Sequence, residues 1–177
     1  EALEALGWPS VGALIGIGLW IFASAFDWKA VSVVVILGST LALLAPLWRL
    51  GNGRNVSRDT RRYIVWPLAL LAGWLTIASA LNVLTEVTAW GIVDERAAPV
   101  WAGAGVLAVV AVAVLMVERT RLVLYVVPIA WGLLAVYVAE REHRPAVALM
   151  AAVASVLVIA FALLRAFQRR ESLLPTA

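Results

Sequence analysis

The sequence has no cysteine and only one histidine, and each shortage excludes a kind of chemistry. Without cysteine the chain has no disulfide framework, no thiolate metal site and no cysteine nucleophile. The single histidine, His143, lies in the charged run EREHR, so a pair of histidines cannot ligate a haem iron within one chain. Charged residues are also scarce, at 14%, where soluble proteins have about 25%.

What replaces the missing charge is apolar sequence. Hydrophobic residues make up 64% of the chain, and the mean hydropathy is +0.97. Such a composition predicts a protein of the lipid bilayer. The formal net charge of +3 is small and dispersed, which argues against a nucleic-acid partner. No lysine falls within an apolar stretch, so a retinal Schiff base is excluded.

Six apolar stretches are long enough to cross a membrane, which takes about 20 residues each. We therefore predict an all-α integral membrane protein, a bundle of about six transmembrane helices arranged as antiparallel hairpins. We expect residues 1–177 to form a single transmembrane domain. The expected spans are residues 10–26, 31–48, 63–90, 100–117, 122–139 and 146–167.

The connecting loops alternate in charge, which predicts the orientation of the chain. The loops on one side carry ten arginines: Arg49, Arg54, Arg58, Arg61, Arg62, Arg119, Arg121, Arg165, Arg169 and Arg170. The other side carries only Lys29, Arg96, Arg141 and Arg144. Because basic residues in short loops stay in the cytoplasm, we expect both ends of this chain to be cytoplasmic, in a bacterial-type inner membrane.

The chain has few residues arranged for catalysis. Its first residue is also not methionine. It contains no nucleotide-binding loop, no zinc motif and no nucleophile beside a base, so we expect neither an enzyme nor a metal site. It begins with Glu1, and EALEALGWPS lacks the basic start and apolar core of a signal peptide. We expect that the chain was trimmed or that its start is missing.

The third expected span, GWLTIASALNVLTEVTAW, carries polar residues where lipid surrounds most of the helix. At 100° per residue, one arc of about 160° gathers Trp74, Ala78, Ser79, Asn82 and Glu86. Polar groups facing lipid are costly, so this arc is expected to face a cavity or a neighbouring helix. Two simpler roles stay open: Asn82 as a hydrogen-bonding contact between helices, and Glu86 as a carboxylate near the interface.

The sequence has nine tryptophans, which is many for its length. Most lie near span ends, where a belt of aromatic residues at the membrane interface explains their positions. Trp20, Trp74 and Trp131 instead lie well inside three spans. There they either pack in the core or form flat walls for a ligand. Gly12 and Gly16 have the small-xxx-small spacing that allows helices to approach closely, within the bundle or between the protomers of a homodimer.

The segment WLTIASALN resembles the last core helix of the tryptophan-rich sensory protein family, also called the translocator protein (TspO/MBR) family. That helix has a tryptophan, an alanine four residues later, and Leu-Asn at seven and eight, here Trp74, Ala78, Leu81 and Asn82. Residues 10–90 resemble the family's core helices three to five, with Trp20 at the tryptophan position of the third. Ile17 and Leu70 stand where the family usually has asparagine and proline.

The resemblance sets expectations for the rest of the chain. The family's first two helices have no counterpart in this sequence, and residues 98–168 are expected to add three helices to the resembling part. In the family, the last-helix tryptophan faces a ligand pocket. The resemblance therefore implies ligand-binding roles for Trp74, Ala78, Asn82 and Trp20, and the polar arc adds Glu86 and Ser79.

Two functions of different classes follow. The first is a sensor or carrier that binds a hydrophobic ligand, either a porphyrin or another tetrapyrrole, a sterol-like lipid or a different apolar molecule. The second is an accessory subunit of a larger membrane complex, which the uniformly apolar last three spans favour. A secondary transporter is disfavoured, because the chain lacks repeated halves with matching broken helices.

Overall fold

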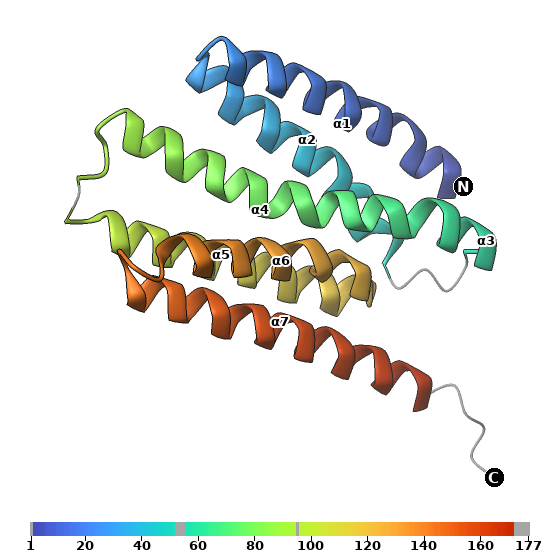
Figure 1. The fold of residues 1–177 in the computed structure, drawn as a ribbon. Coiled ribbons are helices and arrows are strands. Elements are labelled where there is room, and N and C mark those ends of the chain that lie inside the picture. Colours follow the sequence, from blue (N-terminus) through green and yellow to red (C-terminus); the bar gives the residue numbers. More distant parts are fainter. Residues whose placement is uncertain (1, 52–55, 95, 172–177) are drawn as a thin grey trace.

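The structure, a computed structural model, describes residues 2–51, 56–94 and 96–171. These ranges form helices without any β-strand (Figure 1). Six of the helices are long and apolar enough to cross a membrane, as the sequence predicts. Arg54 and Glu1 lie outside the described residues. The elements are α1 (Ala2–Ala25), α2 (Lys29–Leu50), α3 (Arg58–Thr60), η1 (Arg61–Val65), α4 (Trp66–Ala89), α5 (Ala98–Thr120), α6 (Val123–Glu140) and α7 (Pro145–Glu171).

Two helices begin earlier than their apolar runs predict. The third span is continuous from Arg58 through α3, the π-helical η1 and α4. Its start is set by Ser57, whose hydroxyl accepts a hydrogen bond of 3.1 Å from the backbone N–H of Thr60. This satisfies one of the free N–H groups at the helix start. Likewise, α1 begins at Ala2 and not at Ser10. The helical turns that the apolar runs miss contain charged residues, such as Glu4 in α1 and Arg58 and Asp59 in α3.

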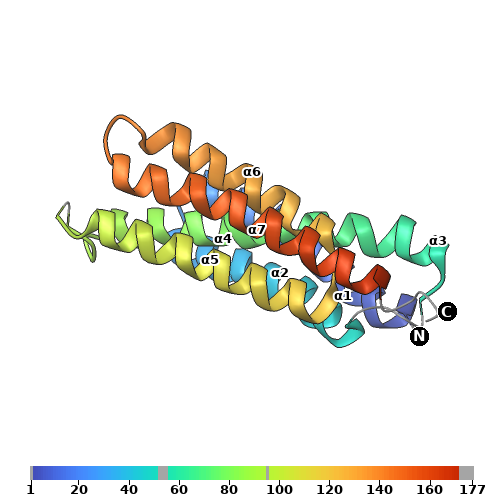
Figure 2. The same cartoon turned by 90° about the horizontal axis from the view of Figure 1, so that it is seen from below.

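Helix α4 lies at the centre of the bundle. It packs against α2, α5 and α6, while α1 packs on α2 and α7 packs on α5 and α6. Figures 1 and 2 show the start of α1 and the end of α7 at the same end of the bundle. This end, called the arginine end, also holds the end of α2, the start of α3 and the turn between α5 and α6 (Figure 1). The far end holds the end of α4 and the turns after α1 and α6.

Glycines let two pairs of helices approach closely, α4 with α6 and α1 with α2. A Cβ on Gly73 would overlap the backbone oxygen of Tyr125 on α6, and one on Gly132 would lie 2.6 Å from Cγ1 of Ile77 on α4. A Cβ on Gly16 would overlap the hydroxyl of Ser39 on α2, so this glycine serves packing within the bundle. A Cβ on Gly12 would meet no other described atom within 4 Å.

Hydroxyl pairs add directional contacts between α4 and two of its neighbours, α6 and α2. The Thr76 and Tyr125 hydroxyls lie 2.8 Å apart between α4 and α6, and Tyr125 is the largest of the fully buried side chains. On the other side of α4, the hydroxyls of Thr40 and Ser79 lie 2.7 Å apart. In the absence of water, such groups must find partners inside the protein. These pairs therefore fix the rotation of α4 between its neighbours.

Candidate functional site

A groove of about 490 Å³ lies between α1, α4 and α6. We call it the tryptophan groove, because all three of the deep tryptophans lie along it. It occupies the half of the bundle nearer the far end, since its lining on α6 runs from Trp131 to Ala139. Its lining residues are Trp20, Trp74, Ile77, Ala78, Leu81, Asn82, Thr85, Trp131, Gly132, Ala135, Val136 and Ala139.

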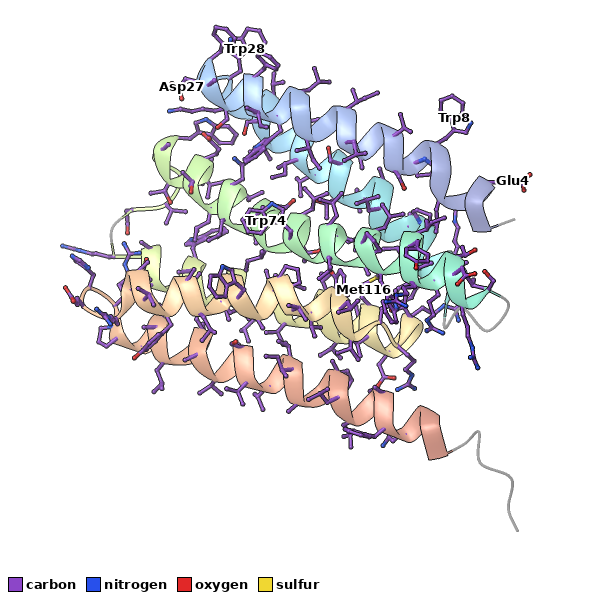
Figure 3. All side chains as sticks on the ribbon, turned by 45° about the vertical axis from the view of Figure 1, so that its right-hand side comes forward. Glu4, Trp8, Asp27, Trp28, Trp74 and Met116 are labelled. Carbon is purple, nitrogen blue, oxygen red and sulfur yellow. The ribbon has the colours of Figure 1, made fainter. Side chains whose placement is uncertain are left out.

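The three indoles come from three different helices. Trp74 on α4, labelled in Figure 3, is 51% exposed, and Trp131 on α6 is 71% exposed, so both offer ring area to an occupant. Trp20 on α1 is half-buried and packs against the core. Its Nε1 is enclosed and has no hydrogen-bond partner among the described residues. Three rigid indoles thus form apolar walls around one space, with an unmet N–H donor among them.

Asn82 supplies an amide to the groove and is also held in place by a hydrogen bond to α2. Its Nδ2 donates to the hydroxyl of Ser32 on α2 at 3.0 Å, and Ser32 Oγ lies 3.3 Å from Oδ1. Ser32 is buried, at 1% exposure. A primary amide has two N–H donors and two acceptor lone pairs. A single hydroxyl partner leaves capacity for a second group on the groove side.

Four of the six predicted site residues therefore come together in the groove: Trp20, Trp74, Ala78 and Asn82. Ser79 does not join them, because it turns toward α2 and pairs with Thr40. Glu86, one turn beyond Asn82, is not among the lining residues. Its side chain is partly buried, and its Oε2 has no hydrogen-bond partner in the described part of the chain.

Two further spaces border α4. A groove of about 520 Å³ lies between α2, α4 and α5, and Thr40 and Ser79 contribute to its lining. A smaller space of about 130 Å³ lies between α4, α5, α6 and α7. In the larger groove, the hydroxyls of Thr40, Thr76 and Ser79 all have partners inside the protein. Apart from the indole of Trp101, its lining is consequently hydrocarbon, whereas the amide of Asn82 in the tryptophan groove keeps spare hydrogen-bonding capacity.

The chemistry available in the tryptophan groove is that of binding. Its described lining residues carry indole, amide, hydroxyl and aliphatic groups, and none of them is ionisable. No three His, Asp or Glu side chains of residues 2–51, 56–94 and 96–171 are grouped to hold a metal ion. Such a site can hold a molecule by shape, dispersion and hydrogen bonds.

Trp131, Thr85 and Gly132 belong to the groove but not to the predicted site. The depth of Trp131 in its span marked it as unusual, yet nothing in the sequence pairs it with Trp74. The pairing depends on α6 packing directly along α4, which Gly73 and Gly132 permit. The two glycines themselves were the available signal in the sequence, since small residues within spans allow close helix contacts.

Comparison with known proteins gave one family. A family model described as TSPO-like protein matches residues 1–164. The matched range includes α1 to α6 and most of α7, well beyond the stretch on which the motif resemblance rests. No curated protein and no solved structure gave a significant match.

Proposed function

The chain belongs to the TSPO-like protein family of membrane proteins, and we propose that it binds a hydrophobic ligand in the tryptophan groove, as a sensor or carrier. The observation that carries the proposal is the meeting of Trp20, Trp74, Trp131 and Asn82 around one space of about 490 Å³. Pockets for small molecules typically have about 300–1,000 Å³. The proposal assigns binding and no catalysis. A porphyrin or another planar apolar molecule matches the indole walls.

The ligand must prefer the groove to the surrounding lipid, which decides what contributes to affinity. Lipid tails are as apolar as the groove, so burial of hydrocarbon alone gains little. Rigid aromatic walls gain from close contact with a flat ligand. A hydrogen bond to Asn82 adds about 0.6–1.7 kcal/mol, from the average to the largest value found for hydrogen bonds between membrane helices. Indoles therefore supply contact area, and the amide supplies orientation.

The first test is a titration of the detergent-purified protein with protoporphyrin IX, followed by quenching of tryptophan fluorescence. We expect saturable quenching in the wild type. Asn82→Leu and Trp74→Phe should each weaken binding about three- to twentyfold. Trp8→Phe, at a position 83% exposed near the start of α1, should bind like the wild type. The dissociation constant, and not the quenching amplitude, is the quantity compared.

A second control separates binding from packing at Asn82. Ser32→Ala removes the contact between Asn82 and α2 but leaves the amide in the groove. If the amide binds ligand, this variant retains affinity while Asn82→Leu loses it. Non-saturable quenching that no variant changes would contradict the proposal. It would favour the accessory-subunit function, which stoichiometric co-purification with partner chains in mild detergent would then support.

The orientation is part of the proposal: the arginine end faces the cytoplasm, in a bacterial-type inner membrane. The cysteine-free chain allows a direct test with single cysteines at two exposed acidic positions, which leaves every basic residue in place. We expect a membrane-impermeant maleimide to label Glu142→Cys in intact cells and Asp59→Cys only after permeabilisation. The reverse labelling pattern would show the opposite orientation.

A further inference from the structure

We propose that the tryptophan groove selects an uncharged ligand that carries a hydrogen-bond acceptor, and discriminates against anionic molecules. The inference rests on the proposed ligand-binding function and names the class of ligand. It depends on three features: the donors that line the groove, the acidic character of the end toward which the groove extends, and Glu86 beside it.

The groove favours acceptors because its polar groups are mostly donors. An indole N–H can only donate, and the groove has three indoles. The N–H of Trp20 is enclosed, without a partner among the described residues, and does not open into the groove. Asn82 has one N–H engaged with Ser32 and a second N–H left over. A carbonyl, ester or ether oxygen on an apolar body would accept a hydrogen bond from this second N–H of Asn82, and it needs no counter-ion.

An anion would meet no cation inside the groove. None of its described lining residues is basic. An ionised carboxylate is expensive to bury in a membrane unless a cation accompanies it. A ligand with a carboxylate would therefore have to extend that group beyond the lining, toward the far end, where Ala139 and Thr85 lie next to Glu140 and Glu86.

The far end is also electrostatically unfavourable for a ligand anion. Among the described residues, its loops and Glu86 carry four basic and five acidic side chains, which leaves a formal net charge of −1; the acidic ones are Asp27, Glu86, Asp94, Glu140 and Glu142. The basic ones are the four already assigned to this side. Two of these are occupied, because Arg144 pairs with Glu140 at 3.4 Å and Arg141 with Glu142 at 3.8 Å.

Glu86 is the acidic group best placed to act on an occupant of the groove. It follows the lining residue Thr85 and lies one turn from Asn82, and its Oε2 has no hydrogen-bond partner among the described residues. Lys29 lies one turn before Ser32, the partner of Asn82, and is the basic side chain nearest in register to Glu86. A carboxylate here offsets that lysine and repels a ligand anion.

A pair of matched probes tests the inference: protoporphyrin IX, which has two carboxylates, and its dimethyl ester, which has the same ring and no charge. Both are titrated into wild type, with ligand concentrations expressed as mole fractions in the micelle, so that partitioning does not mimic affinity. We expect the ester to bind at least about tenfold more tightly than the acid. Asn82→Leu, which keeps a side chain of similar size and removes the donor, should weaken ester binding about threefold or more.

Glu86→Gln separates the local carboxylate from overall charge. This variant should strengthen acid binding about twofold or more and leave ester binding unchanged. Glu142→Gln makes the same change in net charge at an exposed position on the turn between α6 and α7, and should alter neither. An equal effect of the two variants, or none from Glu86→Gln, would overturn the role given to Glu86.

The outcomes distinguish this inference from the function on which it rests. If neither porphyrin binds saturably, the proposed function fails. If the acid binds as tightly as the ester or more tightly, and Trp74→Phe still weakens it, the groove is a binding site and the selectivity inference is overturned.

Discussion

Gly73→Ala should prevent α4 and α6 from packing together and destabilise the bundle by about 3 kcal/mol or more. The added Cβ would overlap the backbone oxygen of Tyr125, and would lie 3.1 Å from its carbonyl carbon and 3.4 Å from Cδ of Pro128. A backbone carbonyl within a helix cannot rotate away, so relief requires the two helices to separate. Separation would also stretch the hydrogen bond between Thr76 and Tyr125, which lies one turn along α4.

The measurement is the fraction of detergent-purified protein that stays monodisperse after heating. At about 2–4 °C per kcal/mol for a chain of this size, the apparent Tm should fall by roughly 6–12 °C. Gly38→Ala is the matched control, because a Cβ on this α2 glycine meets no other atom within 4 Å. Alanine also favours helix by about 1 kcal/mol, so the control should melt at or above wild type. Equal apparent Tm values for the two variants would show that α4 and α6 are not in contact at Gly73.

The same contact explains which parts of the site the sequence could predict. A helical period of 3.6 residues suffices to bring Trp74, Ala78 and Asn82 onto one face of α4, and all three line the groove. Trp20 was assigned by resemblance and also lies there. Hydropathy alone predicted six spans, since the requirement for about 20 apolar residues is a property of the bilayer.

Helical periodicity could not predict which neighbouring helix each residue at the edges of the polar arc contacts. Ser79 and Asn82 both fall within it, yet Ser79 pairs with Thr40 whereas Asn82 reaches the tryptophan groove. An arc of about 160° is wide enough to contact two neighbouring helices, and the sequence does not say where the neighbours lie.

The contribution of α6 to the site was missed for a related reason. Pairing consecutive spans as hairpins leads from α4 to α5, but α4 also packs along α6, two spans later. Trp131 reaches the groove only through this contact. Its determinants are small residues opposite large ones, and a single sequence shows the glycines without showing what stands opposite them.

Gly132→Ala should also loosen the contact between α4 and α6, but here a second substitution, on α4, should restore part of the lost stability. The new Cβ would lie 2.6 Å from Cγ1 and 3.1 Å from Cγ2 of Ile77, which are side-chain atoms and not backbone. Overpacking of this kind costs about 1–3 kcal/mol. Ile77→Ala alone leaves a cavity and is expected to cost about 2–5 kcal/mol, because Ile77 is buried at 4% exposure.

In the double variant the alanine at 132 enters space that the isoleucine has vacated, so the two losses should not add. We expect the double variant to be more stable than the sum of the single effects predicts, by about 1–2 kcal/mol, measured as apparent Tm in a double-mutant cycle. Pairing Ile77→Ala with Gly73→Ala provides the comparison, since no side-chain truncation can move the Tyr125 carbonyl. Additive losses in the first pair would mean that Ile77 and Gly132 are not in contact. In that case α4 and α6 would not have the relative register that places Trp74 and Trp131 along one groove.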